Sequence, residues 1–175
     1  VETWLGWNQT TNSLYVAARV TDDILAIQSD ESNRHLAGRG DNMQIMVDAD
    51  NSGGAFGGSS LQAQRFAMSA SGVRGPTLLP LGIEKPSGVQ CVFTRSGNVY
   101  SYEWVIPGWK TFISPNTVVA HTFQANATIG LGLAFSDYET QAAADAGTPH
   151  AFNVLWGRNP DLSDASQFWK FKLAA

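Results

Sequence analysis

The stretch Ile129-Gly130-Leu131-Gly132-Leu133-Ala134-Phe135 alternates large apolar side chains with small residues. A repeat of two is the period of a β-strand, because successive side chains of a strand point to opposite faces of its sheet. The small residues predict a central strand with one face closely covered by another layer. We therefore expect this stretch to lie in the middle of a layered β-protein.

The same alternation recurs along the chain and extends the prediction to a whole fold. Strands are expected at residues 2–8, 14–20, 43–47, 64–69, 88–94, 99–106, 129–135, 152–157 and 167–173. Turn residues separate them, and Ser96-Gly97-Asn98 is a hairpin signal. Short helical turns are expected at 23–29, 107–112 and 141–146. Together these elements predict an all-β, antiparallel β-sandwich of jelly-roll or immunoglobulin type with one or two short helices.

The composition narrows the class of protein. The chain has 175 residues, of which 43% are hydrophobic and 15% are charged, so one domain over residues 1–175 can bury a sizeable core. Its net charge of −4 and 11 scattered Lys and Arg residues argue against nucleic acid as a partner. No apolar run approaches the roughly 20 residues of a membrane span.

Location and context are expectations of the same kind. Few charges and many Asn, Ser, Thr and Gly residues fit a secreted or cell-surface bacterial module. The chain opens on the strand-like Val1-Glu2-Thr3-Trp4, and we expect a domain excised from a larger protein. The single Cys91 has no partner for an internal disulfide and is expected to be a small buried apolar residue.

Three segments in a fixed order carry a family resemblance. They are LYVAARVTDD (14–23), GDNMQIMVDADN (40–51) and YEWVIPGW (102–109). In this order and spacing they resemble the family 9 carbohydrate-binding modules, which are related to the DOMON-like β-sandwich superfamily. The resemblance implies a non-catalytic module of a polysaccharide-degrading or surface-anchored protein, which binds a sugar or a polysaccharide chain end and holds structural calcium.

The resemblance also points to sugar-binding residues. Members of the family hold a terminal sugar between two Trp rings, whose positions match Gly38 and Leu162 here, so that neither ring is present. Arg65 matches a hydroxyl-binding arginine, Asn159 matches an asparagine, and Gln44 takes the place of a glutamate.

A substitute ring is expected from another tryptophan of the chain. Sugars stack their apolar face on an aromatic ring, while polar side chains bond the hydroxyls. Trp156 ends an expected strand and lies close in sequence to Asn159, so we predict that it supplies this ring.

Two sets of oxygen-bearing side chains are candidates for calcium, which takes six to eight oxygen ligands. Asp48, Asp50 and Asn51 follow an expected strand and precede Gly53-Gly54. The second set comprises Asp22, Asp23 and Asp137. For both sets, ordinary turn chemistry at strand ends is the alternative.

Two other functions stay open. Without rings at Gly38 and Leu162, the chain could be a structural or adhesive module with no sugar ligand. A related sandwich family binds b-type haem through Met with His or Lys, and the candidates are Met43, Met46, Met68, His35, His121 and His150. Catalysis has little support, because the histidines lack ligand spacing and no nucleophile elbow is present. Glu103, in the third segment, is expected to be structural.

Overall fold

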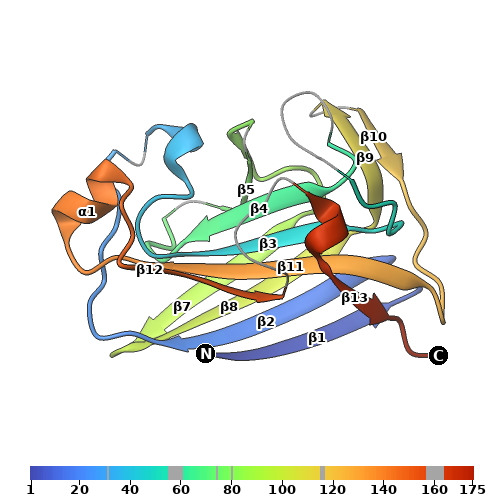
Figure 1. Cartoon of the computed structure of the whole chain (residues 1–175), viewed down its shortest axis with the longest axis horizontal. Helices are drawn as coiled ribbons and strands as arrows, with labels where there is room; N and C mark the ends of the chain where they lie inside the picture. The colour runs from blue at the N-terminus through green and yellow to red at the C-terminus, as the bar shows by residue number, and fades with distance from the viewer. Residues whose placement is uncertain (31, 55–60, 74, 80, 115–116, 157–163) are drawn as a thin grey trace.

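Two antiparallel sheets make up most of the molecule. The computed structural model describes residues 1–30, 32–54, 61–73, 75–79, 81–114, 117–156 and 164–175. Figure 1 shows the sheets stacked, with helix α1 (Gln141–Ala146) at one end and the strand pair β9 (Trp109–Ser114) and β10 (Thr117–Ala120) at the other. This architecture confirms the predicted all-β sandwich.

The first sheet has four strands in the order β1-β2-β8-β7. They are β1 (Glu2–Asn8), β2 (Ser13–Thr21), β7 (Gln90–Ser96) and β8 (Val99–Pro107). Along β2, Leu14 and Val16 are buried whereas Tyr15 and Arg19 are exposed, which is the alternation expected of a sheet with one face on the core. The predicted hairpin at Gly97-Asn98 connects β7 to β8, with Gly97 at a φ of 58°.

The second sheet has seven strands, with β11 and β3 at its centre. Its strands are β3 (Asn42–Asp48), β4 (Gln64–Ser69), β5 (Thr77–Leu79), β6 (Ile83–Glu84), β11 (Thr128–Asp137), β12 (Ala151–Trp156) and β13 (Trp169–Lys172). β11 is long enough to pair with β3 on one side and with β12 and β13 in turn on the other. Nearly all of β3 and β11 is buried, which confirms the central strand predicted from residues 129–135.

The main core lies between the sheets and contains side chains from both. Trp104 of the first sheet is 1% exposed, and its indole Nε1 donates to Met43 Sδ of the second sheet at 3.2 Å. Cys91, on β7, packs against this core as a half-buried free thiol, and burial raises its pKa far above the usual range.

The outer face of the second sheet is covered at both ends. At one end Ala26, Tyr138 and Ala144 form a small apolar cluster beneath α1. At the other end, the 3-10 turn Ala165–Gln167 lies over a second cluster that includes Met46 and Phe168. The strip of sheet between these clusters carries the polar side chains of Asn42, Gln44 and Arg65, of which Asn42 and Gln44 are buried and Arg65 is half-buried.

The helical predictions were partly wrong. Helix α1 forms as predicted, with Thr140 Oγ1 accepting from Ala143 N at 3.1 Å as its N-cap. Residues 107–112 are not helical, because Gly108 donates to Asn12 O and accepts from His121 N, which turns the chain from β8 into β9. Residues 23–29 form no helix either, since Ala26 N is bonded to the Asp41 carboxylate instead.

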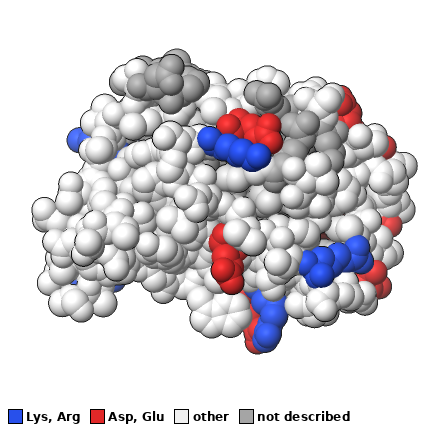
Figure 2. Space-filling model, turned by 180° about the vertical axis from the view of Figure 1, so that it is seen from behind, with Lys and Arg blue, Asp and Glu red and all other residues white. Residues whose placement is uncertain are grey.

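Charge is sparse on the surface seen from behind. Figure 2 shows a mostly uncharged face on which Lys and Arg occur only in small separate groups. This face therefore offers no broad basic patch, in keeping with the composition. None of the helices in the described part of the chain is long and apolar enough to cross a membrane.

Candidate functional site

A chain of hydrogen bonds runs across the outer face of the second sheet. Arg65 on β4 donates from Nε and Nη2 to Gln44 Oε1 on β3, at 2.8 and 2.5 Å. Gln44 Nε2 donates to Asn42 Oδ1 at 2.8 Å, and Asn42 Nδ2 donates to the carbonyls of Gly38 and Gly40 at 3.0 and 2.6 Å. This relay ties the segment before β3 to the two strands beneath it.

The relay gives Gln44 and Arg65 different roles. Gln44 is 1% exposed, and its amide is oriented by a donor on one side and an acceptor on the other, so it holds Arg65 in place. Arg65 is half-buried and reaches the surface. Burial lowers the pKa of its guanidinium, although arginine stays charged.

Gly38 lies directly above this pair. A Cβ built on Gly38 would be 3.4 Å from Leu79 Cδ1 and 3.5 Å from Gln44 Nε2, which are ordinary contact distances. The fold thus brings together Gly38, Gln44 and Arg65 from three separate parts of the chain.

The remaining predicted residues of this site are only partly described. Trp156 ends β12, where its backbone pairs with Leu133 of β11, but its side chain lies outside the described part of the structure. Asn159 and Leu162 also lie outside the described residues. Their roles stay predictions.

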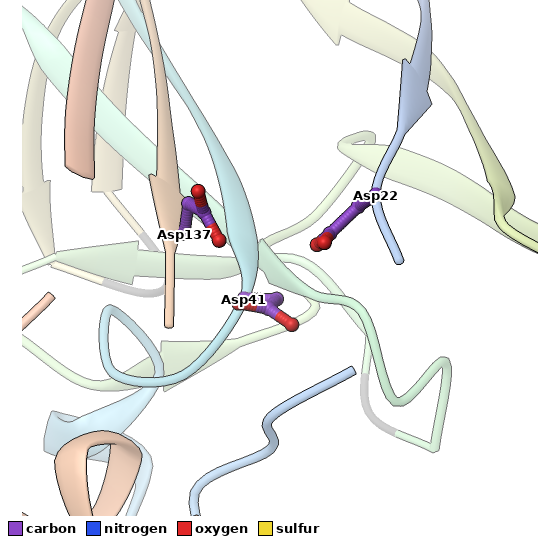
Figure 3. A group of neighbouring side chains, drawn as sticks. All are labelled: Asp22, Asp41 and Asp137. Atoms are coloured by element: carbon purple, nitrogen blue, oxygen red, sulfur yellow. The ribbon is translucent and has the colours of Figure 1, made fainter. Parts of the chain in front are cut away.

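Three carboxylates meet at one end of the sandwich. Asp22 follows β2, Asp41 precedes β3 and Asp137 ends β11, and one oxygen of each lies within 4.8 Å of the others (Figure 3). They line a pocket of about 190 Å³. Asp23 lines the same pocket but is not one of the three that converge.

The protein only partly satisfies these carboxylates. Asp41 is 2% exposed and accepts from Ala26 N at 2.7 Å and from Tyr138 N at 2.8 Å. Asp137 Oδ1 is buried and has no hydrogen-bond partner in the described part of the chain. Such an oxygen is costly to bury unless something positive faces it.

Burial is the main cause of the pKa shifts in this group. It raises the pKa of Asp41 to about 7, with the charges of Asp22 and Asp137 adding to the shift and the two backbone N–H groups opposing it. Burial also raises the pKa of Asp22, and the neighbouring charge of Asp137 acts in the same direction. Three carboxylates whose oxygens lie within 4.8 Å of one another favour a bound cation, which would offset their mutual repulsion.

The other predicted calcium set, Asp48, Asp50 and Asn51, has protein partners of its own. Asp48 is fully buried, and its two oxygens accept from Ser52 N at 3.1 Å and Gly53 N at 2.8 Å. Asp50 lies 3.3 Å from Lys110 Nζ. Asn51 Oδ1 is buried without a partner among the described residues. The backbone amides and Lys110 already supply positive partners, so this set fits a cation less well than the three carboxylates at Asp22, Asp41 and Asp137.

The candidate haem ligands are dispersed. Met43 and Met68 face each other across β3 and β4 inside the core, where Met43 is the acceptor for Trp104. His35 and His150 are exposed. The arrangement offers no support for a haem site.

Asp41 is the residue that sequence reasoning missed. It belongs to the same Gly-Asp segment that carries the family resemblance, so the signal was present. Its convergence with Asp22 and Asp137 depends on three strand ends meeting, which the sequence order does not reveal.

Comparison with known proteins identifies the fold. No protein-family model matches the chain, and no curated protein matches it. A solved family 9 carbohydrate-binding module from Caldicellulosiruptor kristjanssonii, in complex with glucose, has a TM-score of 0.69 over 99% of this chain and 75% of its own, at 14% identity. A structure of such a module from the same organism, in complex with cellotriose, gives 0.69 over 100% and 77%, at 14% identity. The chain therefore has the fold of the family 9 carbohydrate-binding modules.

Proposed function

We propose that this chain, built on the fold of sugar-binding modules, is itself a non-catalytic carbohydrate-binding module that grips a sugar or a polysaccharide chain end. The observation that carries the proposal is the Arg65–Gln44 pair, held on the outer face of the second sheet beside Gly38. Solved modules of similar fold are complexes with glucose and cellotriose. A secreted or cell-surface parent protein that degrades or binds polysaccharide is the expected setting.

The chemistry of the pair suits a sugar. Guanidinium N–H groups donate to hydroxyl oxygens, and half-burial strengthens such bonds by excluding water. Gln44 keeps the guanidinium fixed, so little side-chain entropy is lost on binding. We expect Asn159 and Trp156 to add a polar contact and a stacking ring.

Calorimetry against a panel of mono- and oligosaccharides tests this proposal. Arg65→Ala should weaken sugar binding by at least about 1 kcal/mol, the scale of one hydrogen bond, and Trp156→Ala should do the same through lost stacking. Trp4→Ala is the matched control, because Trp4 is 53% exposed on the other sheet. Unchanged affinity in both site variants would show that Arg65 and Trp156 do not form the sugar site. Loss of affinity in Trp4→Ala alone would place the sugar site on the first sheet.

We also propose structural calcium, held by Asp22, Asp41 and Asp137. The unpartnered Asp137 oxygen and the raised pKa of Asp41 support this set. Asp23 lines the same pocket and could contribute a further oxygen. Asp48, Asp50 and Asn51 remain the alternative candidate set. A bound cation would supply the positive charge that the three carboxylates lack and would tie together three strand ends.

A chelator experiment tests the calcium proposal. A cation that binds only the folded state raises the melting temperature, so EDTA should lower it and added Ca²⁺ should restore it. Asp137→Asn should lessen that response, whereas Asp50→Asn should leave it largely intact. A melting temperature that changes with neither EDTA nor added Ca²⁺ would contradict the calcium proposal.

A further inference from the structure

We infer that the Arg65 site selects sugars that carry a carboxylate, such as uronic acids, over their neutral counterparts. The inference rests on the proposed sugar-binding function and names its ligand class. It follows from the charge of the relay, in which a guanidinium is held by a neutral amide and not by a carboxylate.

The surroundings of Arg65 in the described part of the chain contain no compensating acid that bonds it. Its cross-strand neighbours are Met46 on β3 and Leu79 on β5, both apolar. Asp48 is the next residue on the same face of β3, but its oxygens are taken by Ser52 and Gly53. The positive charge of Arg65 is therefore available to a ligand.

The geometry of the guanidinium points the same way. Its five N–H groups form a planar fork, and Gln44 Oε1 accepts from Nε and from Nη2. No described residue accepts from Nη1 or from the second N–H of Nη2. These two nitrogens present parallel donors, which match the two oxygens of a carboxylate better than a single hydroxyl.

Partial burial strengthens this preference. Charges attract more strongly where water is excluded, and the lowered pKa of Arg65 shows that its charge is incompletely solvated. An anionic ligand would offset the lost hydration of the Arg65 guanidinium, whereas a neutral sugar would remove further water from it without supplying an opposite charge.

Binding of matched sugar pairs tests the inference. Calorimetry at pH 7 and low salt compares glucose with glucuronate, and galactose with galacturonate. We expect each uronate to bind about tenfold more tightly than its neutral partner, because a bidentate ion pair between the carboxylate and the guanidinium replaces a hydrogen bond to a neutral hydroxyl. The advantage should shrink as salt is raised to about 1 M, while binding of the neutral sugars stays nearly constant.

A single substitution should remove the preference. Gln44→Glu places a carboxylate against Arg65, so we expect it to weaken binding of the uronates far more than binding of glucose and to abolish the advantage of the uronates. Arg65→Gln should lose the advantage as well. If Gln44→Glu does not fold, as a melting curve would show, the salt dependence of the wild-type protein decides.

The outcomes distinguish the proposed preference for uronates from the carbohydrate-binding function on which it rests. Neutral sugars that bind as tightly as the uronates would overturn the inference and leave the carbohydrate-binding proposal standing. A folded protein that binds none of the four sugars, nor oligosaccharides such as cellotriose or trigalacturonate, would overturn both.

Discussion

At the scale of single residues, Gly38 decides how tightly this site can hold a sugar. Gly38 has no side chain at the position where the resemblance places an aromatic ring. It lies beside Gln44, the partner of Arg65. A Cβ at Gly38 would meet its neighbours at ordinary contact distances, so the backbone there accepts a residue with a side chain. The missing ring is thus a property of the residue and not of the fold.

Gly38→Trp should therefore increase affinity. A ring over the relay would stack on a sugar bound at Arg65, and we expect about fivefold tighter glucose binding, equivalent to roughly 1 kcal/mol. Calorimetry measures the change. Gly6→Trp, which adds a ring on the outer face of the first sheet, is the control and should leave affinity unaltered. Weaker binding in Gly38→Trp would mean that the ligand lies elsewhere.

Asp41 should make stability depend on pH. The pKa of its carboxyl is about 7 in the folded protein and ordinary, near 3.8, in the unfolded chain. Between these values the unfolded chain releases a proton that the folded protein keeps, so the free energy of unfolding falls as pH rises from about 4 to 7. Below that window the stabilising contribution is complete, and above it the contribution is lost.

Denaturant unfolding of the chelated protein at a series of pH values measures this slope. Asp41→Asn should flatten it, and Ca²⁺ should stabilise the wild-type protein more at pH 7 than at pH 5. Asp23→Asn is the control, because Asp23 is exposed and lies outside the three converging carboxylates. Identical slopes for Asp41→Asn and the wild type would contradict this assignment.

The candidate site was only partly predictable from the sequence. Arg65 and Gln44 were found because their positions match hydroxyl-binding residues of the family that the sequence resembles. Gln44 was predicted to bond sugar hydroxyls, but it is buried and bonds Arg65 and Asn42, so the role that we propose for it is to position Arg65. Burial and pairing of this kind depend on cross-strand neighbours, which a single sequence does not specify.

At the scale of elements, alternation identified the long strands and missed the short ones. Strands β1 and β4 have the predicted bounds. The short strands β5 and β6 are too brief to show a period. Strand β9 was mistaken for a helix, because Pro107 resembles a helix start when its tertiary contacts are unknown.

Gly108 makes the corner between β8 and β9. A Cβ there would lie 2.3 Å from His121 O, a backbone atom that cannot easily move. Gly108→Ala should therefore destabilise the fold by about 1–3 kcal/mol, as expected for overpacking. Urea unfolding measures the loss, and Gly6→Ala, where a Cβ has nothing within 4 Å, should change stability by less than about 0.5 kcal/mol. Equal effects of the two variants would show that the corner can relax.

At the scale of the whole molecule, packing and a buried polar contact join the two sheets. Trp104 and Met43 belong to different sheets. The hydrogen bond from Trp104 Nε1 to Met43 Sδ satisfies an indole N–H that is buried away from water. This contact fixes how the sheets sit against each other as well as how much area they bury.

Met43→Leu should cost more stability than Met68→Leu. Both changes keep the volume of a buried side chain, but only the first leaves the Trp104 N–H without an acceptor. We expect the difference to be about 1 kcal/mol, measured by thermal or urea unfolding. Equal losses in the two variants would show that the sulfur contributes packing alone.

The half-buried thiol on β7 has a practical consequence. Thiol-reactive dyes attack the thiolate, and burial keeps Cys91 protonated at neutral pH. A maleimide fluorophore should therefore couple to a cysteine engineered at the surface and pass over the native one. The unmodified sequence is in that respect already suited to site-specific labelling for fluorescence titrations.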